Sequence, residues 1–163
     1  MSARLEELER ACGYPVSRET FERLKGFEAL FRKWNAQINL ASASTLDVLW
    51  SRHIVDSAQL VRYAQDARCW ADMGSGGGLP GAVVAILLDR SCEVHLLESN
   101  RKKAGFLQAA IGEFSLPARV HARRIDEEIK DLGQPEIVTA RALAPLPLLL
   151  ELAFPWLSTG ATG

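Results

Sequence analysis

A glycine-rich segment, Gly74-Ser-Gly-Gly-Gly-Leu-Pro-Gly81, is the part of this chain best suited to hold a ligand. Glycine has no side chain, so ligand atoms can approach the backbone, and free amides at the start of a following helix favour negative charge. Gly74, Ser75, Gly76 and Gly78 are therefore candidate contacts for a nucleotide-like cofactor. A dinucleotide fingerprint needs a third glycine where Leu79 stands, so the loop follows a different design.

Two acidic residues flank this loop in the sequence. Glu98 ends the apolar run that begins at Glu93, about where an acid would accept hydrogen bonds from ribose hydroxyls. Asp72 directly precedes the loop and could either hold it by bonding its amides or accept a hydrogen bond from a cofactor amine. A tight turn beside a solvated glutamate is the simpler alternative.

Further polar groups lie before and after this pair. His53, Asp56 and Ser57 are spaced to share one helix face, which either fastens the N-terminal helices to the sheet or shapes a substrate pocket. Basic residues that could contact phosphates or simply face solvent form three groups, namely Arg52, Arg101-Lys102-Lys103 and Arg119-Arg123-Arg124. Arg101 and Lys102 are the better placed, because they begin a helix directly after Glu98.

The elements that must position these residues alternate between strand and helix. Strands are expected at 69–73, 93–98, 118–122 and 136–140, with helices at 82–88, 99–114, 126–130 and 145–157. Such alternation predicts an α/β fold with a parallel sheet built by right-handed crossovers. Residues 158–163 resemble the turn before a fifth strand, so the sheet is expected to lack its C-terminal strands.

The first 65 residues are predicted to form a helical N-terminal extension packed on the core formed by residues 66–163, within a single structural domain. Ser17 can cap a helix whose apolar residues follow three-and-four spacing from Phe21 to Trp34. A second helix is expected over residues 45–63.

Composition sets the broad class. The chain has 163 residues, 48% of them hydrophobic, with 19 basic and 20 acidic residues and a net charge of −1, which suits one globular domain and excludes disorder. Its longest aliphatic run, 82–88, is too short to cross a membrane, and its start lacks the order of a secretory signal. Three cysteines without metal-ligand spacing favour a reducing, cytoplasmic setting and no metal site.

At the motif level the chain resembles the ribosomal small subunit methyltransferase G family, also called glucose-inhibited division protein B. The resemblance covers roughly residues 20–160. It rests on motifs that occur in the family's order, namely Asn39-Leu-Ala, Arg52-His53-x-x-Asp56-Ser57, Asp72-x-Gly-Ser-Gly-Gly-Gly-Leu-Pro-Gly81, Leu97-Glu-Ser-x-Arg101-Lys102 and Arg141-Ala142.

This resemblance implies a class I, Rossmann-like methyltransferase fold and S-adenosylmethionine as methyl donor. It also implies methylation of nitrogen 7 of a guanine in 16S ribosomal RNA of the small ribosomal subunit. By position, Gly74 and Leu79 match the family's loop contacts, Glu98 its ribose-binding acid, usually Asp, and Arg141 a cofactor-proximal arginine. Ile125 and Asp126 match the pair that flanks the adenine, and family chains usually continue through three further strands.

Chemistry at nitrogen 7 requires orientation rather than proton abstraction, since this atom carries a lone pair and no hydrogen. No catalytic acid or base is therefore assigned; His53, Asp56 and Arg141 are expected to act as positioning residues. The expected RNA contacts are Arg52, Arg101, Lys102, Arg123 and Arg124, and the protein is expected to be a monomer that binds no membrane. Two alternatives stay open: a nicotinamide-dependent (NAD) oxidoreductase on a similar sheet and a non-catalytic ribosome-binding module.

Overall fold

A computed structural model describes residues 2–125, 132–141 and 143–163 of the chain. Asp126, the short helix expected at 126–130 and Ala142 lie outside these described residues. Within them the strands are β1 (Cys69–Met73), β2 (Glu93–Leu97), β3 (Ala118–His121) and β4 (Ile137–Ala140), all paired in parallel in the order β3-β2-β1-β4. The α/β fold with a parallel sheet is confirmed, and each strand lies within one residue of its predicted bounds.

The N-terminal region is helical, as predicted. It contains α1 (Ala3–Cys12), α2 (Arg18–Ile38) and α3 (Ala43–Asp47). The Ser17 hydroxyl caps α2 by accepting a hydrogen bond from the Thr20 amide, and the predicted apolar stripe of α2 is buried from Phe21 to Phe31. Asn39 ends the helix in the left-handed conformation, at φ 58°.

The single helix predicted over residues 45–63 is wrong. After α3 the chain turns at Val48 and passes through a π-helix, η1 (Leu49–Ile54), then α4 (Val55–Ala58) and a 3-10 helix, η2 (Gln59–Tyr63). The apolar spacing did not reveal these breaks. The 3-10, α and π helices differ by only one residue in the span of their hydrogen bonds, so their apolar residues recur at similar intervals. The π-helix carries His53.

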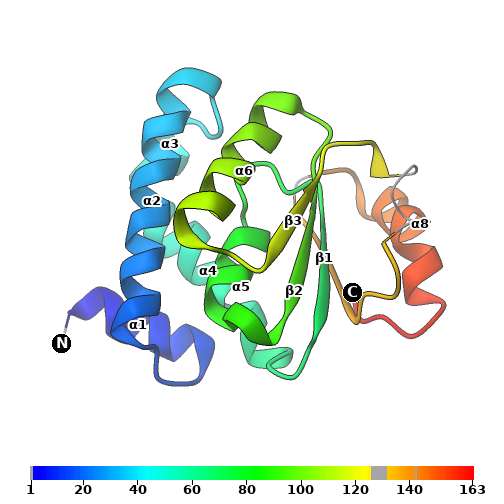
Figure 1. The fold of residues 1–163 in the computed structure, drawn as a ribbon, viewed down its shortest axis with the longest axis horizontal. Helices are drawn as coiled ribbons and strands as arrows, with labels where there is room; N and C mark the ends of the chain where they lie inside the picture. Colours follow the sequence, from blue (N-terminus) through cyan, green and yellow to red (C-terminus); the bar gives the residue numbers. More distant parts are fainter. Residues whose placement is uncertain (1, 126–131, 142) are drawn as a thin grey trace.

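Helices cover both faces of the sheet, as Figure 1 shows: α2 and α6 (Arg101–Phe114) lie on one side, and α8 (Leu146–Leu157) on the other. Between β1 and β2 come α5 (Gly81–Leu88), all of whose residues are buried, and the 3-10 turn η3 (Asp89–Ser91). One hydrophobic cluster joins the N-terminal helices to α5, α6 and the sheet, and a smaller one lies under α8. The division at residue 65 stays a prediction.

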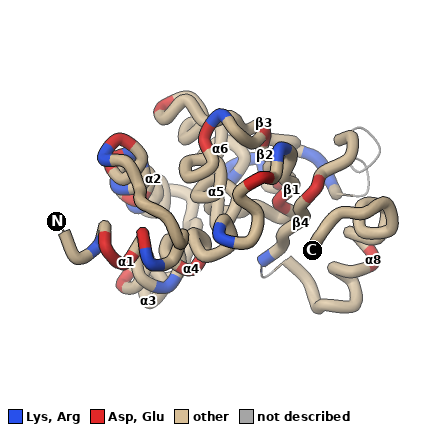
Figure 2. Tube along the Cα trace, turned by 90° about the horizontal axis from the view of Figure 1, so that it is seen from below, with Lys and Arg blue, Asp and Glu red and all other residues tan. Residues whose placement is uncertain are grey.

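Charge is distributed unevenly over the helices. Figure 2 shows basic and acidic positions interspersed along α2, whereas α8 carries one acidic residue, Glu151, and no basic one. After α8, Thr162 forms an isolated parallel bridge with Ile137 of β4. In the part of the chain that the structure describes, no helix has both the length and the apolar character to span a bilayer.

Candidate functional site

The glycine-rich loop begins where β1 ends and is held against β2. The Ser75 amide donates to the Leu97 carbonyl at 3.0 Å, and the Gly78 amide donates to the Ser75 carbonyl at 2.7 Å. Gly74, Gly76 and Gly78 have φ values of 65°, 52° and 79°, in the left-handed region that favours glycine. The loop therefore needs glycine for its backbone path.

Two of these glycines differ in what surrounds them. A Cβ on Gly78 would lie 2.7 Å from the Cβ of Ala82, so this glycine is needed for close packing on α5. A Cβ on Gly76 would meet nothing closer than the Gly74 carbonyl oxygen, at 3.8 Å. The backbone at Gly76 is thus open to a ligand, while Gly78 supports the loop from below.

Asp72 lies beneath the loop and is 1% exposed. Its Oδ2 accepts from the Gly81 amide at 3.1 Å, and its Oδ1 accepts from the Thr139 hydroxyl at 2.9 Å. Trp70 Nε1 donates to the same hydroxyl at 3.0 Å, which completes a buried network between β1 and β4. Of the two roles left open for Asp72, holding the loop is the one that these contacts match.

Burial raises the pKa of Asp72 to about 6, although hydrogen bonds from Thr139, Ser75 and Gly81 act in the opposite direction. A folded-state pKa above the ordinary 3.8 means that the folded protein holds this proton more tightly than the unfolded chain. The stability that Asp72 contributes is therefore fully present below pH 3.8 and is lost as the pH rises through 6.

Asp72→Asn should remove this pH dependence. Between pH 4 and pH 7 the free energy of unfolding of wild type should fall by about 2 kcal/mol relative to that of the variant, because asparagine does not ionise. Urea denaturation at both pH values measures the difference, with the exposed Asp66→Asn as the control. A constant gap between wild type and Asp72→Asn would contradict the raised pKa.

Glu98 links the loop to the end of β2. Its Oε1 accepts from the Gly76 amide at 2.8 Å, and its Oε2 accepts from the Asn100 amide at 2.9 Å. Glu98 is only 9% exposed, yet it lines a cleft over the loop. Asn100 in turn caps α6, because its Oδ1 accepts from the Lys103 amide. The acid predicted from the sequence thus lies directly beside the predicted loop.

A cleft of about 510 Å³ lies over this loop, between the carboxyl ends of the strands and the N-terminal helices. The predicted residues that line it are Gly74, Ser75, Gly76, Leu79, Glu98, His53 and Arg141. The other lining residues, none of them predicted as a cofactor contact, are Phe31, Leu40, Ala41, Thr45, Gly77, Lys103 and Leu143. The tertiary structure therefore joins seven predicted residues in one cavity.

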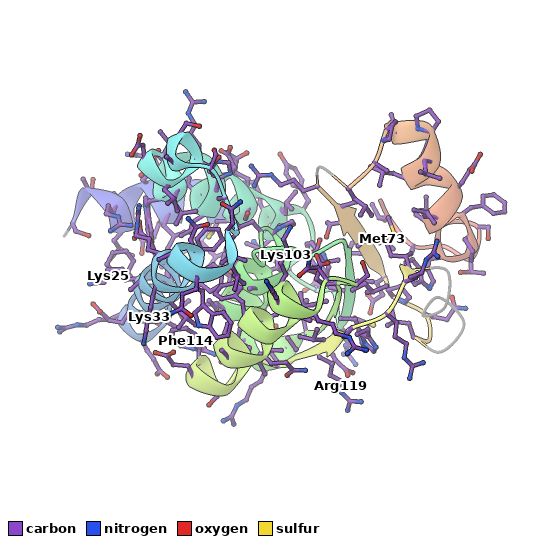
Figure 3. All side chains as sticks on the ribbon, turned by 90° about the horizontal axis from the view of Figure 1, so that it is seen from above. Lys25, Lys33, Met73, Lys103, Phe114 and Arg119 are labelled. Atoms are coloured by element: carbon purple, nitrogen blue, oxygen red, sulfur yellow. The ribbon has the colours of Figure 1, made fainter. Side chains whose placement is uncertain are left out.

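Two of these further lining residues, Lys103 and Leu143, differ in whether the sequence held a signal for them. Figure 3 shows Lys103 extending from α6 at the centre of the view, while Arg119 lies at the periphery. Lys103 had a sequence signal, since it follows Arg101 and Lys102. Leu143 had none: it lies so close to the loop that a Cβ on Gly74 would come within 2.6 Å of its Cδ1.

His53 and Arg141 meet at this cleft although they are 88 positions apart in the sequence. Arg141 Nη2 lies 2.6 Å from His53 Nδ1. Burial lowers the pKa of His53, the Arg141 charge lowers it further, and Asp56 raises it. These surroundings therefore favour the neutral form of His53.

Asp56 and Ser57 lie on the neighbouring side of Arg141. Both line a second cleft of about 400 Å³ that also touches Pro80 and Arg141. Asp56 is exposed, whereas Ser57 is 2% exposed and its hydroxyl donates to the His53 carbonyl at 2.6 Å. The common face predicted for His53, Asp56 and Ser57 therefore stays a prediction, and the Ser57 hydroxyl is bonded within its own helical turn.

Other predicted residues lie outside the cleft. Asp72 and Gly78 support the loop from within the protein, and Ile125 packs at the edge of the smaller hydrophobic cluster. Arg52, Arg101, Lys102, Arg123 and Arg124 are exposed. Arg119 pairs with Glu93 at 3.2 Å. A larger cavity of about 670 Å³ lies near the start of β4, and none of the predicted site residues lines it.

Known proteins of similar sequence point to one family. The family model described as rRNA small subunit methyltransferase G matches residues 20–162. A protein from a Chelativorans species, named Ribosomal RNA small subunit methyltransferase G, is 53% identical over 163 residues, which cover 99% of this chain and 77% of that protein. A Brucella canis protein of the same name is 56% identical over 149 residues, covering 90% of this chain and 70% of its own length.

The match includes the glycine loop, Glu98, His53 and Arg141, and it extends over far more than half of the chain. A nicotinamide oxidoreductase and a non-catalytic module gain no support from these relatives. The chain belongs to the rRNA small subunit methyltransferase G family.

Proposed function

We propose that this methyltransferase transfers a methyl group from S-adenosylmethionine to nitrogen 7 of a guanine in 16S ribosomal RNA of the small ribosomal subunit. The observation that carries the proposal is the contact between Glu98 and the Gly76 amide, which puts an acid and an open backbone side by side in one cleft. The name of the relatives supports the class of RNA.

The cleft has the donors and acceptors that such a cofactor needs. A carboxylate offers about four lone-pair positions, and the two amides at Glu98 occupy only two of them. Both oxygens can therefore still accept from ribose hydroxyls. Gly74, Ser75, Gly76 and Leu79 would contact the cofactor along the loop, together with Arg141, while Asp72 and Gly78 keep the loop in shape. Ile125 and Asp126 are proposed for the adenine on the family resemblance.

When bound, the cofactor supplies an electrophilic methyl group on a sulfonium sulfur. The residues of this chain then need only to orient the guanine, because nitrogen 7 has a free lone pair and loses no proton. Orientation of this kind can supply about 7–11 kcal/mol of a reaction barrier. His53 and Arg141 line the cleft, Asp56 lines the neighbouring cleft that Arg141 also touches, and all three are proposed as positioning residues. No residue is assigned as a general base.

RNA contacts are proposed for Arg52, Arg101, Lys102, Arg123 and Arg124, which are exposed cations. The net charge of −1 provides no general attraction to a polyanion, so local groups of this kind must supply it. Ribosomal RNA as substrate makes the cytoplasm the proposed location, and a monomer is proposed as the active form.

A thermal-shift experiment tests the cofactor half of this proposal. S-adenosylhomocysteine at about 100 times its Kd should stabilise the fold by about 2.7 kcal/mol, which raises the Tm by about 5 to 10 °C. NAD at the same concentration should leave the Tm unchanged. Stabilisation by NAD instead would favour the oxidoreductase.

A transfer assay tests the other half. Small ribosomal subunits from cells lacking the modification are incubated with donor labelled on its methyl group, and the RNA is then digested to nucleosides. Label in 7-methylguanosine is the expected result. Cofactor binding without transfer to any form of the subunit would favour the non-catalytic module.

A further inference from the structure

The contact between Arg141 and His53 determines the protonation state of the histidine. A guanidinium can only donate hydrogen bonds, so the Nδ1 atom that faces Arg141 Nη2 at 2.6 Å must accept and cannot carry a proton. The ring is therefore neutral, with its proton on Nε2. The direction of the pKa shift of His53, below its ordinary value, is consistent with this geometry.

A neutral partner leaves the charge of Arg141 uncompensated. Several other described arginines lie against carboxylates, among them the pairs Arg23–Asp89, Arg32–Glu28 and Arg119–Glu93. Among the residues that the structure describes, no carboxylate lies within ion-pair distance of Arg141. The guanidinium is thus fixed in direction by one hydrogen bond, while its charge and its remaining donors stay available for an anion.

The backbone around His53 holds its imidazole in place for the contact with Arg141. His53 belongs to the π-helix η1, a conformation that occurs often at functional sites. The Ser57 hydroxyl donates to the His53 carbonyl at 2.6 Å, and Ile54 beside it is fully buried. The imidazole therefore projects from a well-anchored turn, and it lines the same cleft as Glu98 and Lys103.

We infer that neutral His53 is a positioning residue that holds Arg141 as an uncompensated cation for the carboxylate of the cofactor's amino-acid portion. This inference rests on the proposed function, because it takes that cofactor as the ligand of the cleft. Protonation of His53 at low pH removes the acceptor and places two cations side by side, so cofactor affinity should fall. The charged groups that face the imidazole are Arg141 and Asp56, with Glu98 and Lys103 also lining the cleft.

Side-chain isosteres make the test specific. Asparagine places its Oδ1 close to where the histidine has Nδ1 and does not titrate, whereas glutamine places its amide near the Nε2 position. Calorimetry with S-adenosylhomocysteine from pH 5 to pH 8 should show His53→Asn within about threefold of wild type at pH 8. His53→Ala and His53→Gln should bind about tenfold more weakly, the loss of one charge-assisted hydrogen bond.

The pH dependence of the affinity distinguishes this role of His53 from a purely structural one, which would not change it. Wild type should lose affinity as the pH falls through the pKa of His53, and His53→Asn should not lose it over the same range. The exposed Ser51→Ala, on the same turn, serves as the matched control. Equal affinity of wild type and His53→Ala at pH 8, or the same pH profile in His53→Asn, would overturn the inference.

A second arm needs no cofactor and so separates this inference from the proposed function. NMR titration of the His53 ring should give a pKa below the ordinary 6.5 in wild type, and a higher pKa in Arg141→Gln, because the neighbouring positive charge is gone. An unchanged pKa in Arg141→Gln would show that the pair does not form. Failure of all variants and wild type to bind S-adenosylhomocysteine, with the pKa difference present, would instead reject the cofactor.

Discussion

Glu98→Ala is expected to weaken the binding of S-adenosylhomocysteine by at least about 100-fold. The carboxylate is proposed to accept hydrogen bonds from two ribose hydroxyls, and each bond to a charged acceptor contributes about 1.5–3 kcal/mol. The variant also leaves the Gly76 and Asn100 amides without their acceptor, so the loop loses its link to β2. Isothermal titration calorimetry measures the effect. Glu98→Gln keeps one carbonyl oxygen, so its affinity should lie between those of wild type and Glu98→Ala.

Glu93→Ala provides the matched control for this substitution. Glu93 lies at the other end of the same strand, is 49% exposed at its side chain and pairs with Arg119 rather than with the loop. Its removal should change the affinity for S-adenosylhomocysteine less than twofold. Surface ion pairs contribute little to stability, and Glu93 lies at the end of β2 away from the cleft. Equal losses from Glu93→Ala and Glu98→Ala would mean that damage to the sheet, and not a lost ligand contact, explains the result.

Gly78→Ala is expected to reduce the free energy of unfolding by about 2–5 kcal/mol. A left-handed backbone, here at φ 79°, costs about 1–2 kcal/mol for a residue with a Cβ, and overpacking costs about 1–3 kcal/mol more. The added methyl group would lie 2.7 Å from Ala82 and 3.2 Å from Leu107, both of them buried. Urea denaturation of the purified chain measures the loss.

Two other glycines separate the causes of that loss. Gly76→Ala shares the positive φ but meets no atom closer than 3.8 Å, so it should lose only the backbone part, about 1–2 kcal/mol. Gly112→Ala lies within α6 with nothing within 4 Å and should be neutral or stabilising by up to about 1 kcal/mol. If Gly76→Ala and Gly78→Ala lose the same stability, close packing at Gly78 contributes nothing.

The sequence by itself determined the order and type of most elements and the chemistry of the loop. Alternating apolar runs predicted all four strands, because a buried parallel strand leaves a local signature within five residues. Ser17 predicted the start of α2, and the place of Glu98 at the end of the second predicted strand indicated an acid near the loop. These features depend on residues close together in the chain.

Only the tertiary structure decided which side chains share the cleft. Thr139 reaches Asp72 because β4 lies beside β1, and Arg141, directly after β4, reaches His53 in η1. Apolar periodicity encodes neither contact. Helix α6 brings Lys103 to the same cleft, and Asp72 is buried beneath the loop. Local patterns fix which face of an element is buried, whereas contacts between distant residues depend on how whole elements pack together.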